Sequence, residues 1–212
     1  MSLRARTKFV AENKPAVRAG VTLFCDRETL QSHWVRLVLA EKDVDGARIE
    51  WVLPNKPPNE DLLVLNPELT LPTLIDRDTV IHPARVIAEY LDERYPIPRL
   101  MPSDPAVRAR LRMVLLRIEK DLFPLAGFIL AGKGDVKNAR KTLTEHLITS
   151  AKLCPASRGW FMGLDYNLVD CAWAVLLYRL ASLNLKLPNE VAPLVRYAER
   201  LFARPAFQKT LR

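Results

Sequence analysis

The chain has little of what several classes of protein require. Its three cysteines, Cys25, Cys154 and Cys171, form neither a Cys-x-x-Cys pair nor a metal-binding spacing. We therefore expect reduced thiols, no metal site and a cytoplasmic protein. No apolar run approaches the roughly 20 residues of a membrane-spanning helix. The first six residues lack the apolar stretch of a secretory signal. The sequence thus predicts no membrane partner.

Charge is plentiful but unevenly spread over the 212 residues. Residues 1–20 hold five basic residues and one acidic residue, a net charge of +4. Residues 21–98 carry a net −6 and residues 99–212 a net +10, within a total of +8. An acidic first half joined to a basic second half indicates a binding partner of some kind. Solvated helix faces would give the same pattern, and both readings stay open.

The first half alternates strand and helix patterns. Residues 1–20 are polar and basic without periodicity, which predicts a flexible tail. Residues 21–95 follow the order β-α-β-α-β-β-α, which predicts a thioredoxin-like α/β domain. We expect strands at 21–24, 49–53, 73–75 and 79–81, and helices at 32–42, 59–65 and 83–94.

The second half is predicted to be all helical. Residues 96–103 form a linker stiffened by prolines, and residues 104–212 form the helical domain. Pro124 is expected to kink or end the first helix of that domain. Asn167 and Asp170 have the spacing of a capping box, a folding device that needs no catalytic role. Further helices are expected at 135–153, 168–183 and 191–202, followed by a short C-terminal helix.

Two segments, 69–76 and 87–93, resemble the middle of a glutathione-transferase-type thioredoxin domain. The resemblance implies a C-terminal helical domain of the same type. It also implies a cis peptide bond before Pro72, with the backbone of Leu71 facing the cysteine of glutathione. Thr29 falls where many such enzymes carry the Ser or Cys that activates the thiol.

The start of the third helix departs from that pattern. Where the enzymes have an acidic residue followed by Ser, this chain has Pro83 and Ala84, which lack an N–H and a hydroxyl. We therefore expect no cofactor and no catalytic residue. A glutathione-dependent thiol enzyme using Thr29 or Cys25 remains the alternative. The vestigial glutathione-site positions are Thr29, Leu71, Pro72, Pro83 and Ala84.

A more specific resemblance, to the stringent starvation protein A family, is carried by four further segments, 89–96, 100–102, 117–121 and 168–171. It covers roughly residues 21–211. It implies a homodimer, with Val86, Tyr90 and the helix from Val107 as candidate contacts. It also implies a bacterial RNA polymerase-associated transcription regulator without transferase activity.

The partner-binding surface of that family centres on a Pro-His-Pro, which corresponds here to Pro96, Ile97 and Pro98. Isoleucine replaces the histidine, and a plain interdomain linker is the competing interpretation. A pI of 9.6 permits DNA binding, but no recognition motif is present, so DNA contact is expected only indirectly or weakly. The predicted partner-binding residues are Arg94, Tyr95, Pro96, Ile97, Pro98, Arg99 and Leu100.

Overall fold

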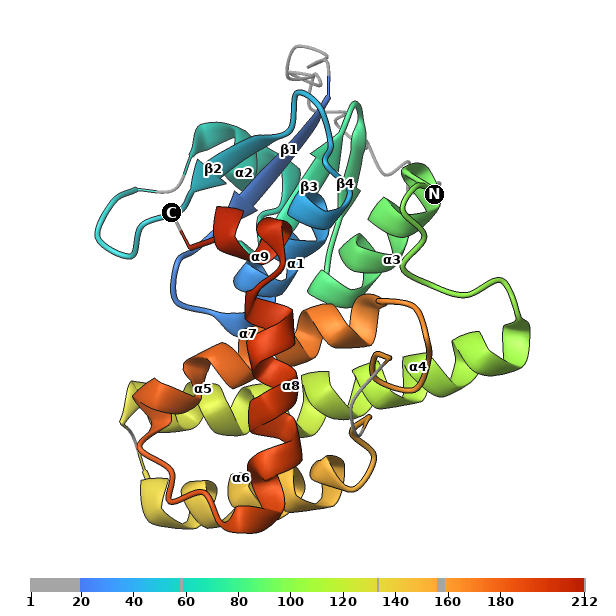
Figure 1. Ribbon diagram of the computed structural model, residues 1–212. Helices are drawn as coiled ribbons and strands as arrows, with labels where there is room; N and C mark the ends of the chain where they lie inside the picture. The colour runs from blue at the N-terminus through green and yellow to red at the C-terminus, as the bar shows by residue number, and fades with distance from the viewer. Residues whose placement is uncertain (1–19, 58, 133, 156–158, 212) are drawn as a thin grey trace, which may run out of the picture.

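The computed structural model describes residues 20–211 apart from 58, 133 and 156–158. The predicted tail therefore lies outside the described residues except for Gly20. The chain folds into an α/β half followed by a helical half, as Figure 1 shows. The predicted fold class is confirmed.

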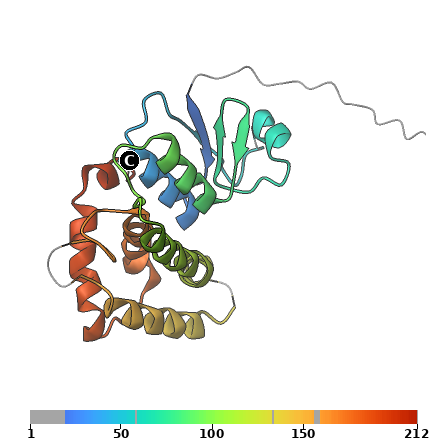
Figure 2. The ribbon, with the colours of Figure 1, turned by 90° about the vertical axis from the view of Figure 1, so that its right-hand side faces the viewer.

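A four-stranded sheet in the order β2-β1-β3-β4 forms the centre of the first half. Strand β1 runs parallel to β2 and antiparallel to β3, and β4 returns antiparallel to β3. Helices α1 and α3 cover one face, and α2 covers the other (Figure 2). The elements are β1 Val21–Cys25, α1 Leu30–Glu41, β2 Arg48–Trp51, α2 Glu60–Leu65, β3 Thr73–Asp76, β4 Thr79–Ile81 and α3 Ala84–Arg94.

Helix α7 forms the core of the second half, because every residue from Leu168 to Leu177 is buried. It packs against α1, α4, α5 and α8, while α9 returns to α1 and so joins the two halves. The elements are α4 Pro105–Arg117, a π-helical turn Ile118–Leu122, α5 Phe123–Ala131, α6 Val136–Ala151, α7 Leu168–Leu183, a 3₁₀ turn Asn189–Val191, α8 Ala192–Phe202 and α9 Pro205–Lys209. No helix in the described part of the chain is both long enough and apolar enough to cross a membrane.

Several predicted boundaries move by one or two residues. Helix α1 begins at Leu30, two residues early, because Thr29 caps it. The prediction that Pro124 ends or kinks a helix is only partly right. The chain stays helical from Pro105 to Ala131, and Pro124 lies in the first turn of α5, directly after the π-helical turn. The missing N–H is tolerated at that position.

Candidate functional site

The vestigial thiol-site positions gather at one edge of the sheet. Thr73 pairs with Phe24, so the start of β3 lies beside the end of β1. Ile81 pairs with Leu74, which brings the end of β4, and hence the start of α3, to that edge. The peptide bond between Leu71 and Pro72 is cis, which confirms the prediction. The fold therefore retains the arrangement in which a thiol substrate would lie.

Thr29 is fully engaged in local hydrogen bonds. Its hydroxyl donates to Asp26 Oδ2 over 2.8 Å and accepts from the backbone N–H of Ser32 over 3.3 Å. The hydroxyl of Ser32 donates to the same carboxylate oxygen over 2.8 Å. Because the one proton of the Thr29 hydroxyl is directed at Asp26, it is not available to stabilise a thiolate.

Two ionisable groups beside Thr29 also disfavour thiol chemistry. Burial raises the pKa of Asp26, but hydrogen bonds from Thr29, Ser32 and Glu28 outweigh it and hold that pKa below its ordinary value. The carboxylate is therefore ionised. Burial raises the pKa of the Cys25 thiol to about 12, so this thiol stays protonated at neutral pH.

The start of α3 has no side chain suited to holding a carboxylate. Pro83 occupies the N-cap without a side-chain hydrogen bond, and Ala84 is buried. Neither residue supplies the N–H and hydroxyl pair that a γ-glutamyl carboxylate requires. His82 is exposed next to them.

The capping box at the start of α7 is confirmed. Asn167 accepts from the N–H of Val169 over 2.9 Å, and Asp170 accepts from the N–H of Asn167 over 2.7 Å. Asp170 also accepts from the N–H of Phe161 over 2.8 Å and from the hydroxyl of Tyr197. Burial raises the pKa of Asp170 to about 7 against these bonds. These bonds join the start of α7 to Phe161 and to Tyr197 of α8, which fits a folding role.

A buried ion pair anchors the predicted partner-binding loop. The Nζ atom of Lys42, at the end of α1, donates to Asp92 Oδ1 over 2.5 Å and to the carbonyl oxygens of Tyr95 and Pro98 over 2.8 and 2.5 Å. Asp92 in turn accepts the N–H of Leu100 over 2.7 Å. The side chains of Lys42 and Asp92 are 0% and 5% exposed. The loop is thus held at three backbone positions by groups that solvent does not reach.

The loop presents one apolar side chain to solvent. Ile97 is 85% exposed, and Pro96, Pro98 and Arg99 are exposed around it. Leu100 is buried and serves as an anchor. Beside the loop, the guanidinium of Arg94 pairs with Asp76 over 3.4 Å and lies over the Tyr95 ring. An anchored loop loses little order when a partner binds.

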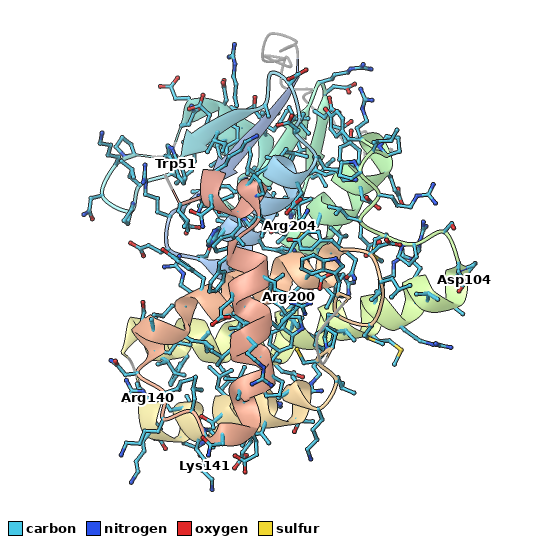
Figure 3. The ribbon with its side chains drawn as sticks, viewed as in Figure 1. Trp51, Asp104, Arg140, Lys141, Arg200 and Arg204 are labelled. Carbon is cyan, nitrogen blue, oxygen red and sulfur yellow. The ribbon has the colours of Figure 1, made fainter. Side chains whose placement is uncertain are left out.

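A pocket of about 590 Å³ adjoins the loop on the helical side. Residues 98–102 form one wall and residues 162–167 the other. Leu164 is 86% exposed at its rim. Arg204, labelled in Figure 3, lies over the Tyr166 ring at 3.6 Å and is paired with Glu41 over 2.6 Å. Sequence reasoning missed this wall, because residues 162–167 show no periodicity and meet the loop only in the fold.

The comparisons with known proteins agree with this architecture. A family model described as "Glutathione S-transferase, N-terminal domain" matches residues 30–94. A stringent starvation protein A homologue of Coxiella burnetii is 41% identical over 92% of each chain, and one of Pasteurella multocida is 40% identical over 92% of this chain and 91% of its own. The chain belongs to the stringent starvation protein A family.

Solved structures place this family member on the transferase scaffold. A glutathione transferase homologue from Burkholderia, solved with bound glutathione, is 28% identical, covers 91% of this chain and 97% of its own, and superimposes with a TM-score of 0.69. This chain thus has the glutathione transferase fold, with the hydroxyl of Thr29 engaged in local hydrogen bonds.

Proposed function

We propose that this protein is a non-enzymatic, cytoplasmic transcription regulator that binds bacterial RNA polymerase as a homodimer. The observation that carries the proposal is the anchored loop, which holds the 85% exposed side chain of Ile97 over the buried Lys42–Asp92 pair. The family resemblance supplies the partner class. An exposed apolar side chain on a rigid support is the type of group that contributes most to protein binding.

The surroundings of the loop suit a protein partner better than a small substrate. The pocket beside it is lined by Met101, Leu111 and Leu164 among others and reaches the loop at Pro98 and Arg99. Arg99 lies exposed between loop and pocket. An apolar centre with a basic edge fits a partner segment that carries an apolar anchor and acidic neighbours.

The thiol site supports binding over catalysis. The hydroxyl of Thr29 is directed at a carboxylate, the Cys25 thiol is held protonated, and Ala84 has no hydroxyl to offer a ligand. The Burkholderia homologue shows that glutathione can bind this fold, so glutathione transfer remains the second candidate. Thiol-transfer activity above the rate of a Thr29→Ala variant would favour that candidate.

The homodimer is proposed through α3 and α4. Val86 on α3 and Met113 on α4 are 48% and 70% exposed, and Arg112 of α4 pairs with Glu89 of α3 over 2.5 Å. The two helices thus form one surface with exposed apolar side chains. A second copy of this surface would cover them.

The test is binding of purified RNA polymerase holoenzyme to wild type, Ile97→Glu and Val64→Glu. Val64 is 64% exposed on α2 and serves as the matched control. We expect Ile97→Glu to weaken binding about 30-fold, as loss of a central anchor does. Val64→Glu should bind like wild type, and both variants should stay dimeric by light scattering. Wild-type affinity for Ile97→Glu, or binding of wild type to random DNA alone, would contradict the proposal.

A further inference from the structure

A separate pocket of about 130 Å³ lies between the two halves, with lining residues from both. It is open to solvent and is lined by the end of β2, by α1, by α7 and by residues 210–211 after α9. Trp51, labelled in Figure 3, lies next to α9 on the side of the pocket that the sheet forms. Its basic and aromatic lining residues are Arg27, His33, Arg36, Trp51, Tyr178 and Arg179.

The pocket concentrates positive charge. None of its three guanidinium groups forms an ion pair with a carboxylate of the described residues. Arg36 donates to the carbonyl of Thr210 over 2.9 Å, and Arg179 donates to the carbonyl of Arg27 over 3.2 Å. The nearby Asp26 carboxylate is ionised, but its oxygens accept from Thr29 and Ser32 and form no ion pair with these arginines. Carbonyl groups satisfy donors but do not neutralise charge.

The charges act on one another. Burial lowers the pKa of Arg36, and the charges of Arg179 and Arg27 lower it further, while Cys25 and the nearby Asp26 carboxylate act in the opposite direction. Burial, Arg36 and Arg179 lower the pKa of His33 to about 3, so its ring is neutral at neutral pH. A bound anion would remove this repulsion, because it would place negative charge among the three guanidinium groups.

Buried donors in the pocket lack partners within the described part of the chain. They are Nε of Arg36 and Nε of Arg179. Arg36 is only 8% exposed. A buried guanidinium N–H without an acceptor is costly, so such groups are commonly found where a ligand or water accepts from them.

The aromatic ring of Trp51 holds two of the arginines. The Cζ atom of Arg27 lies 4.4 Å from the ring centroid, and that of Arg36 lies 5.0 Å from it. A guanidinium stacked on an aromatic face keeps its N–H edge free for an acceptor in its plane. The ring therefore positions the two groups without using their donors.

We propose that this pocket binds a phosphate group, either inorganic phosphate or the terminal phosphate of a monoester. Three guanidinium groups match an anion with two charges and several acceptor oxygens better than a carboxylate with one charge and two oxygens. The volume equals about four water molecules at about 30 Å³ each, which admits one phosphate group and leaves any larger remainder outside. Binding would join α1 and β2 to α7.

The test measures phosphate binding to the full chain by calorimetry and by ¹⁵N NMR of the arginine Nε–H signals. The variants are Arg27→Gln and Arg179→Gln, since the more buried Arg36 is less safely changed. The control is Arg140→Gln, because Arg140, like Arg179, donates to a backbone carbonyl, that of Leu183 over 3.0 Å, but stands on α6, which does not line the pocket (Figure 3). Inorganic phosphate and glycerol phosphate are compared at constant ionic strength set with sodium chloride.

We expect submillimolar binding by wild type and by Arg140→Gln, and a loss of about tenfold or more in each pocket variant, because a charge-assisted hydrogen bond disappears. The Nε–H signals of Arg36 and Arg179 should shift on titration. Tighter binding of glycerol phosphate would identify a monoester ligand, and equal or weaker binding would identify free phosphate. The proposal is overturned if no binding occurs at millimolar phosphate, or if Arg140→Gln loses as much affinity as the pocket variants.

Discussion

Replacing Lys42 with methionine should destabilise the protein strongly. The substitution keeps an apolar stem of similar length but removes an ammonium whose side chain is 0% exposed. It leaves the Asp92 carboxylate buried with only the N–H groups of Leu100 and Met101, at 2.7 and 3.0 Å. The carbonyls of Tyr95 and Pro98 lose the same donor. Removing one partner of a buried pair costs about 3–5 kcal/mol.

We expect the lower end of that range, about 3 kcal/mol, because two backbone N–H groups continue to solvate the carboxylate. The free energy of unfolding is measured by urea titration at fixed protein concentration, so that any dimer equilibrium is held constant. The matched control is Lys141→Met. Lys141 pairs with Glu145 over 4.0 Å, and both side chains are well exposed. Such a pair contributes little to stability.

A loss below about 1 kcal/mol in Lys42→Met would refute the reasoning, because that is the contribution expected of a surface pair. So would an equal loss in both variants, which would point to a general effect of reduced charge. A large loss with unchanged polymerase binding would separate the two roles given to the pair. It would show that the pair stabilises the fold without ordering the loop around Ile97.

Two further predictions follow from the shifted pKa values. The pKa of Asp170, raised to about 7 by burial, exceeds its ordinary value, so the folded state binds more protons than the unfolded state. Its contribution to stability is therefore full at pH below the ordinary pKa and is lost as pH rises towards 7. Asp170→Asn should show a flatter pH dependence in urea titrations over that window, and a slope equal to wild type would contradict this. Burial raises the pKa of the thiols of Cys25 and Cys154 to about 12 and about 11, so the native protein should resist iodoacetamide at pH 8 while the unfolded protein reacts. The extent of modification is measured by mass spectrometry. Rapid labelling of Cys25 in the native protein would refute the prediction.

The sequence predicted those features that depend on neighbours along the chain. The capping box of Asn167 and Asp170 and the strand that begins at Thr73 both follow from local spacing. The effect of Pro124 was harder to predict, because the helix accepts a proline there only in combination with the π-helical turn before it. A turn of that type leaves no sequence signal that we could use. The domain boundaries at 95/96 and 103/104 stay predictions.

Features that depend on distant pairs were not predictable. Lys42 and Asp92 are 50 residues apart, and Arg179 meets the backbone at Arg27 across 152 residues. In the sequence each of these charges is indistinguishable from one on a solvated helix face. Only the fold shows that Lys42 is buried in an ion pair, whereas Arg36 is buried without an ion pair to any carboxylate of the described residues. The candidate loop was therefore located from sequence, but the reason for its rigidity was not.

The position of Asp26 explains why an intact scaffold need not retain thiol chemistry. A glutathione thiolate near Thr29 would compete with a carboxylate that already holds the hydroxyls of Thr29 and Ser32 at 2.8 Å. Like charges in one site repel each other, so the ionised Asp26 carboxylate would raise the pKa of any thiol bound beside it. Because Asp26 also accepts the N–H groups of Glu28 and Thr29, it is the carboxylate that organises this end of α1. The same hydrogen bonds that stabilise the helix start thus oppose a thiolate there.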